Sequence, residues 1–179
     1  MIPFSVISCL ILSLWGFLIS ESCSPVRCWR SRLTWNLSFM RCLNPYISQF
    51  DPNLHNFTYI QQKSAFLLSA ILSASSKAFH PPLHAQLQAH TEKLLGKAFI
   101  KGEKSVEIVQ GILVLTYWKE PEEARTWLLV GYAIRMCIEM GWHRLPDLCS
   151  DGGNMSELDI REHRNIQRTW LVLFVYDRR

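Results

Sequence analysis

The sequence lacks the residue spacings that most metal sites and active sites require. No two of its six cysteines are separated by only two residues, and the nearest pair, Cys23 and Cys28, has four residues between its members. An isolated pair at this spacing does not make a tetrahedral zinc site. No local pattern sets a nucleophile beside a base or brings two carboxylates together. We therefore predict that the chain is not an enzyme and has no catalytic, cofactor-binding or metal-ligating residue.

The cysteine distribution and the charge argue against two further classes of protein. Six cysteines scattered over 179 residues do not resemble a disulfide framework, and Cys137 is expected to be a buried free thiol. The net charge of +4 is small and the basic residues are dispersed. A DNA-binding module usually has a concentrated basic face. The chain itself is therefore not expected to bind nucleic acid.

Helical periodicity is clearest in residues 105–144. Ser105 can cap a first helix by accepting a hydrogen bond from a free backbone N–H group. A stripe of apolar residues with a helical period follows, at Val106, Val109, Leu113 and Tyr117. Pro121 suits the first turn of a second helix, and Gly141 suits its C-terminal end. The short connection predicts an antiparallel helix hairpin, in which Gly131 is small because the partner helix comes close.

The segments before the hairpin also indicate helices. Residues 44–59 contain two proline turns and are expected to form a loop. Gln61–Phe79 and Leu83–Ile100 are predicted helices, and Gly102 is expected to end the second of them. We find no internal repeat, low-complexity tract or credible pair of strands.

A last helix is predicted after residue 156. Ser156 and Asp159 resemble a capping box, and Glu157 and Arg161 are spaced to pair along the helix. The helix becomes apolar from Trp170 to Tyr176, close to the end of the sequence. The predicted fold is therefore all-α, an antiparallel helical array of helix hairpins, and we expect it to be incomplete at the C-terminus.

Four motifs in this order and spacing resemble the regulatory (middle homology) domain of fungal zinc binuclear cluster transcription factors. The family has a Ser-x-Glu-x-x-Gln helix, a tryptophan-rich turn, a Gly-x-Ala-x-Arg-Met element and a closing Gly-x-His-Arg. The matching residues here are Ser105, Glu107, Gln110, Gly131, Ala133, Arg135, Met136, Gly141, His143 and Arg144. A later family helix bearing arginine and tryptophan is similar to Arg164–Arg178. Ser64 also matches a family serine that opens an apolar helix.

The resemblance implies a function that the residues alone do not. It implies nuclear regulation of RNA polymerase II genes by residues 44–179, the N-terminal part of such a regulatory domain. DNA would be contacted only through the family's zinc cluster, which this chain is expected to lack, so its zinc is not a cofactor here. A small-molecule effector or transcriptional regulators are the partners implied. The target genes, the effector and the oligomeric state are not implied.

Residues 1–43 are foreign to that family pattern. Met1–Ser20 carry no charge and form an apolar run that could be a secretory signal or a transmembrane anchor. The run could also be a non-native start, such as a misplaced gene boundary. These alternatives stay open, and with them a second function, that of a membrane-anchored or secreted helical protein.

Three groups of side chains were weighed as candidate sites. Arg135, Glu139, His143 and Arg144 could form an effector pocket, although a structural ion-pair network is the favoured interpretation. Arg164, Arg168, Asp177 and Arg178 could hold an anion, although the arginines are expected to brace acidic residues of the hairpin. Tyr117, Trp118 and Trp127 could line a ligand pocket, although at helical spacing they are expected to be core. The histidines show no metal-ligand spacing and default to surface or satisfied core positions.

Overall fold

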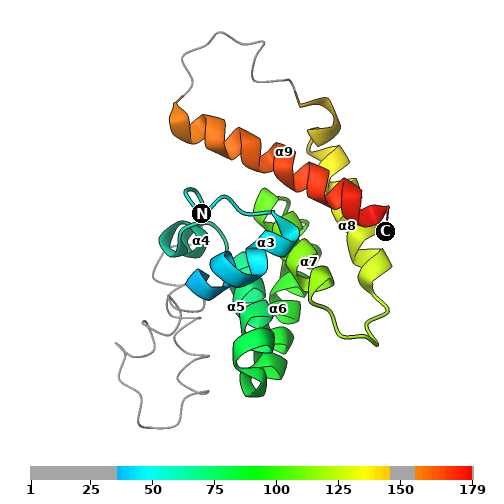
Figure 1. Ribbon diagram of the computed structural model, residues 1–179. Coiled ribbons are helices and arrows are strands. Elements are labelled where there is room, and N and C mark those ends of the chain that lie inside the picture. The colour runs from blue at the N-terminus through cyan, green and yellow to red at the C-terminus, as the bar shows by residue number, and fades with distance from the viewer. Residues whose placement is uncertain (1–35, 146–155, 179) are drawn as a thin grey trace.

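The computed structural model describes residues 36–145 and 156–178, and within them the chain is entirely helical (Figure 1). Residues 36–38 are helical, and seven further α-helices, one short π-helix and one 3-10 helix follow in the described residues, without a strand. In chain order they are η1 (Phe39–Leu43), α3 (Asn44–Ile47), α4 (Phe57–Lys63), α5 (Ala65–Phe79), α6 (Pro81–Lys101), α7 (Val106–Tyr117), α8 (Thr126–Glu139), η2 (Trp142–Arg144) and α9 (Glu157–Asp177). The predicted all-α fold of helix hairpins is confirmed.

Serine side chains begin three of the helices. Ser64, Ser105 and Ser156 accept hydrogen bonds from the backbone N–H groups of the third residue beyond each. Such caps satisfy donors that the first turn of a helix leaves free. At α9 the Asp159 side chain returns a bond to the Ser156 N–H group, so the predicted capping box is present. The predicted pair of Glu157 and Arg161 is also present, at 2.6 Å.

Glycines end two of the helices, as predicted. Gly102 follows α6 with φ of 63° and Gly141 follows α8 with φ of 77°. A residue with a Cβ rarely adopts this left-handed conformation. The chain can therefore reverse at these two points and return against the helix that it has left.

The predicted start of α8 at Pro121 is wrong. The helix begins at Thr126, and residues around Pro121 form a turn. Local bonds hold this turn, because the Glu123 carboxylate accepts from both the backbone N–H and the guanidinium of Arg125. The hairpin connection is therefore longer than the proline suggests.

The predicted helix Gln61–Phe79 is interrupted at Ser64. This residue is extended, with φ of −155° and ψ of 118°, and it separates α4 from α5. Its N–H group bonds to Ile60 O and so completes α4, while its hydroxyl caps α5. The predicted loop 44–59 is also partly helical, because α3 begins at Asn44 and α4 begins at Phe57.

Helix α7 forms the centre of the packing. Every residue from Ile108 to Val114 is buried, which is expected of a helix surrounded by other helices. Helices α5, α8 and α9 all pack against it, and α6 packs against α5. Figure 1 shows α9 crossing α7 and α8 rather than lying alongside them.

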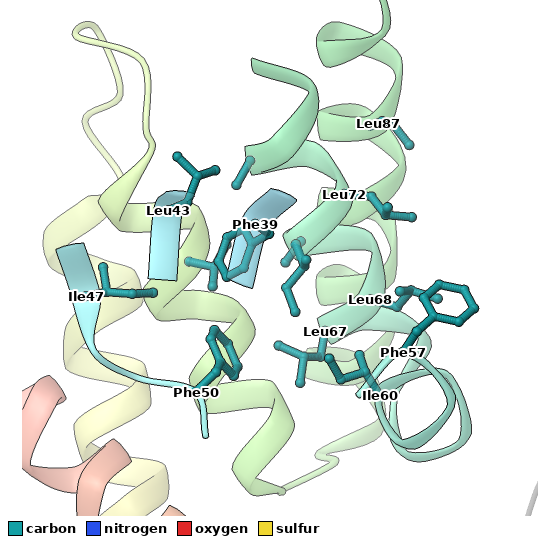
Figure 2. Close-up of a cluster of buried hydrophobic side chains, with 14 residues drawn as sticks. Phe39, Leu43, Ile47, Phe50, Phe57, Ile60, Leu67, Leu68, Leu72 and Leu87 are labelled. Atoms are coloured by element: carbon teal, nitrogen blue, oxygen red, sulfur yellow. The ribbon is translucent and has the colours of Figure 1, made fainter. Parts of the chain in front are cut away.

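Two hydrophobic clusters lie around this central helix. In the first, shown in Figure 2, side chains from η1 and the following residues meet α4 and α5. Phe39 belongs to this cluster, and its ring packs edge to face against Phe50 and Trp118. The second cluster joins α7 to α8 and α9 and contains Val109, Met136 and Leu173.

Two glycines in helices have different surroundings. A Cβ built on Gly111 of α7 would lie 2.4 Å from the Phe66 ring, so α5 approaches α7 closely there. A Cβ on Gly131 of α8 would meet nothing within 4 Å, so the expectation that Gly131 is small for helix contact is wrong. Nearby Ala133 is fully buried in the second cluster.

Some predictions fall outside the described residues. These are the apolar run Met1–Ser20, Cys23, Cys28 and the loop 146–155. In the described part of the chain, no helix is long and apolar enough to cross a membrane. Cys137 is a buried free thiol, as predicted. The division at residue 43 stays a prediction.

Candidate functional site

The most unusual feature of the described core is a group of buried polar side chains beneath α9. We call it the docking seam, and define it as His55, Gln110, Asn165, Arg168 and Thr169. The Gln110 amide, fully buried on α7, donates to Asn165 Oδ1 at 2.8 Å and to Thr169 Oγ1 at 3.1 Å. Thr169 in turn donates to the Asn165 backbone oxygen. Both amide protons of Gln110 are thus used to hold α9.

His55 lies beside this amide, in the loop before α4. Its Nδ1 atom is 3.1 Å from both the backbone nitrogen and the backbone oxygen of Asp51. Burial lowers the pKa of His55 to about 4, Asp51 opposes this shift, and the charge of Arg168 adds to it. His55 is therefore neutral at neutral pH, which suits a position next to a guanidinium.

The docking seam has polar atoms that are not fully satisfied by the described residues. His55 Nε2, Gln110 Oε1 and Arg168 Nη1 are buried and have no hydrogen-bond partner there. His55 Nε2 and Arg168 Nη1 can each donate a hydrogen bond, and Gln110 Oε1 can accept one. A small movement of these side chains could therefore bring a donor to the acceptor. An unpaired polar group inside a protein costs free energy. The seam therefore holds α9 less favourably than a fully paired network would.

Ion pairs flank the seam on its solvent side. Arg161 of α9 lies 3.5 Å from Asp51, and Glu162 accepts from Tyr59 at 3.1 Å and from Lys63 at 3.0 Å. Burial and the charge of Glu162 both raise the pKa of Tyr59. Such exposed pairs contribute little stability. They orient the first half of α9 over α4 and the loop before it.

Apolar packing holds the other half of α9. Leu173 is fully buried in the second cluster, and the Tyr176 hydroxyl donates to the Thr116 backbone oxygen at 2.9 Å. The helix is therefore held by hydrocarbon contacts near its C-terminal end and by directional hydrogen bonds near its middle. Directional bonds require one register of α9, whereas hydrocarbon contacts tolerate several.

Two further observations concern metal binding and thiol reactivity in the described residues. No group of three or more His, Cys, Asp or Glu side chains in residues 36–145 and 156–178 could hold a metal ion. Burial raises the pKa of the Cys137 thiol to about 12, so it is a poor nucleophile.

The first predicted cluster is not brought together. Arg135, Glu139, His143 and Arg144 are all exposed, and no ion pair joins them to one another. Glu139 pairs instead with Lys104, in the loop before α7. The expected ion-pair network at this end of the hairpin is therefore wrong, although Glu139 does tie the hairpin to the preceding loop.

The second predicted cluster is dispersed along α9. Arg164 is exposed and Arg168 is half-buried, and neither forms an ion pair with an acidic residue of the hairpin. Arg178 lies over the Phe174 ring at 4.3 Å. The expected bracing is wrong: Arg168 Nη1 is buried without a hydrogen-bond partner in the described residues, and the charge of Arg168 acts on His55.

The predicted aromatic group divides into core and surface. Trp118 packs on Phe39, as expected of a core residue. Trp127 is 74% exposed, so the core interpretation is wrong for it. Tyr117 and Trp127 line a hollow of about 460 Å³ with Tyr176 of α9.

Sequence reasoning missed the docking seam as a unit. The sequence analysis names Gln110 only as part of a family motif. It predicts that His55 lies on the surface or is hydrogen-bonded in the core. One signal was available, because Gln110 stands in the otherwise apolar run from Ile108 to Leu115. A polar residue at the buried face of a helix requires a partner. Its partners lie 55 and 59 residues further along the chain.

Comparison with known proteins adds a family to this geometry. Residues 35–179 match the family described as "Fungal specific transcription factor domain". Protein priB of Lentinula edodes is 39% identical over 151 residues, which cover 83% of this chain and 24% of that protein. The C6 finger domain transcription factor hasF of Aspergillus fumigatus is 31% identical over 132 residues, or 69% of this chain and 16% of hasF. The chain thus spans a quarter or less of these relatives. No solved structure matches it.

Proposed function

The chain belongs to the fungal specific transcription factor domain family, and from this premise we propose that it regulates transcription of RNA polymerase II genes in the nucleus. The observation that carries the proposal is the family match over residues 35–179. The family is one of transcription factor domains and not of enzymes. We assign the regulatory role to residues 44–179.

Contact with DNA would belong to another part of a longer protein. This chain is similar to 16% of a C6 finger domain transcription factor, which supports the proposal that DNA binding and regulation belong to different parts of the protein. The small dispersed charge and the cysteine spacing of this chain support it as well. A zinc cluster outside the matched segment would read the DNA, and the helical domain would restrain or license activation.

The docking seam supplies a mechanism for such restraint. A small-molecule effector or a protein regulator that prefers one arrangement of α9 would shift the balance between docked and displaced states. Displacing α9 would uncover Gln110 on α7 and Leu173 on α9, both fully buried when the helix is docked. Displacement of α9 would then expose a surface of the longer protein to which other proteins could bind.

A reporter assay tests this proposal. The whole chain is placed between a heterologous DNA-binding domain and an activation region in a fungal cell, with a fusion lacking the chain as reference. We expect the chain to lower reporter output, and Gln110→Leu to restore part of it, because the variant loses both bonds to α9. Gln62→Leu is the matched control, since Gln62 is an exposed glutamine on α4.

Two results would count against the proposal. One is equal reporter output with and without the chain, at equal amounts of nuclear fusion protein. The other is equal effects of the Gln110 and Gln62 substitutions, which would remove the docking seam from the mechanism.

A further inference from the structure

A second face of α6 is not used to build the core. The helix packs on α5 through one stripe, in which Leu87, Thr91 and Ala98 are buried. Another stripe, at helical spacing, faces α8 across the end of α7 and contains Glu92, Gly96 and Phe99. Helices α6 and α8 are not among the pairs that pack closely together. A hollow of about 310 Å³ lies between them, within the range of small-molecule sites.

Two bridges span this hollow. Arg125, just before α8, donates to Glu92 of α6 at 2.9 Å. Further along, the rings of Phe99 and Tyr132 meet edge to face with centroids 5.1 Å apart. Both bridges are formed by partly exposed side chains, and they connect α6 to α8 across the hollow.

Gly96 keeps the wall of the hollow open. It stands in the interior of a 21-residue helix, where alanine would be more stable. A Cβ at this position would meet no atom within 4 Å. No neighbouring protein group therefore requires a glycine here. The absent side chain leaves room that a bound molecule would use.

The charges at the rim favour an uncharged occupant. Two acids and two bases line the hollow, Glu92, Glu123, Lys119 and Arg125, so their charges cancel. Arg125 is committed to both carboxylates, and its bonds lower the pKa of Glu123 to about 2. Among the described residues that line the hollow, Lys119, which is exposed, is the one charged group without an ion-pair partner.

The walls of the hollow are mainly apolar. Leu95, Leu115, Leu128 and Leu129 line it with hydrocarbon. Tyr132 closes one end with its ring, which packs on Phe99, while the charges that act on its hydroxyl belong to Lys104 and Glu139, outside the hollow.

We propose that the hollow between α6 and α8 binds an uncharged, mainly hydrocarbon small molecule. The identification of this molecule as the effector rests on the proposed function. The binding itself does not, because it is a property of the purified chain.

The test uses two fluorescent probes that differ in charge. N-phenyl-1-naphthylamine is uncharged with a single N–H group, and 8-anilinonaphthalene-1-sulfonate has the same rings with a sulfonate. Both are titrated into the full 179-residue chain. We expect saturable binding of one equivalent of the uncharged probe, tighter than that of the sulfonate.

Two leucine variants locate the site. Gly96→Leu should weaken binding of the uncharged probe by at least about tenfold, because the side chain fills the space that the probe occupies. Gly131→Leu is the matched control, since Gly131 is also in a helix interior with open surroundings but does not line this hollow. It should change the affinity by less than about twofold.

The outcomes separate this inference from the proposed function. Absence of saturable binding by the wild-type chain, equal losses in the two leucine variants, or tighter binding of the sulfonate would overturn it, whatever the reporter assay shows. Circular dichroism checks that each variant is folded. If Gly96→Leu does not fold, Gly96→Ala replaces it, and an affinity unchanged in that variant would overturn the proposal.

Discussion

Replacement of Gly111 by alanine tests how tightly α5 and α7 are packed. A methyl group there would lie 2.4 Å from Phe66 Cε1 and 2.9 Å from Cδ1. These distances are far shorter than a normal contact, so the ring must move. Phe66 is only 5% exposed and borders a hollow of about 520 Å³. The Phe66 ring can avoid the clash by rotating toward that hollow, which would expose part of its surface.

Two opposing effects set the magnitude. Alanine favours the helix over glycine by about 0.5–1 kcal/mol. Overpacking a core typically costs about 1–3 kcal/mol. We therefore expect Gly111→Ala to lower the free energy of unfolding by about 1–2 kcal/mol. In a Phe66→Leu background the ring is absent, and the same alanine should be neutral or should raise that free energy by up to about 1 kcal/mol.

Urea unfolding followed by circular dichroism measures both effects. Gly96→Ala is the control, because its methyl group meets nothing within 4 Å and should simply stabilise α6. If Gly111→Ala stabilises the wild-type chain as much as Gly96→Ala does, the reasoning about close packing is refuted. Equal effects of Gly111→Ala in the two backgrounds would refute the assignment of the clash to Phe66.

Three further predictions concern the docking seam and a cap. The folded pKa of His55 is about 4 against 6.5 unfolded, so the unfolded chain binds the proton first as the pH falls. Stability should therefore drop by about 3 kcal/mol between pH 6.5 and 4, and His55→Asn should flatten this part of a stability–pH profile. Gln110→Leu should cost about 2–4 kcal/mol in urea unfolding, because Asn165 and Thr169 lose their amide donor while buried. Ser105→Ala should cost about 1 kcal/mol in the same assay, and Ser105→Asp should preserve most of the stability.

Local chemistry explains which helix ends could be predicted. Ser105 and Gly141 act through bonds and dihedral angles within their own turn, so the sequence around them is sufficient. Pro121 did not show where α8 begins, because proline is as compatible with a connecting turn as with the first residues of a helix. The bond between Glu123 and Arg125 holds the turn that precedes α8. Several charged residues lie close together in this stretch, so the sequence does not indicate that these two would pair.

Long-range contacts explain what could not be predicted of the site. Gln110 was recognisable as an isolated polar residue in an apolar run, but nothing local indicates that Asn165 is its partner. Arg135 and Glu139 are four residues apart, a spacing at which oppositely charged side chains on a helix can pair. Glu139 pairs instead with Lys104, which lies outside the helix. Exposed helix pairs are worth a few tenths of a kcal/mol, so a competing partner easily displaces them. The existence of the helices and partners within one helical turn, such as Glu157 and Arg161, was therefore predictable, whereas partners distant in the sequence were not.

The single extended residue between α4 and α5 has a mechanical consequence. Ser64 completes one helix and caps the next, so the connection has no slack. Helix α4 is about 10 Å long, its Ile60 is buried in the first cluster, and its Tyr59 and Lys63 bond to Glu162 of α9. A displacement of α9 would therefore act on the first cluster and on α5 through α4, without a loop to absorb it.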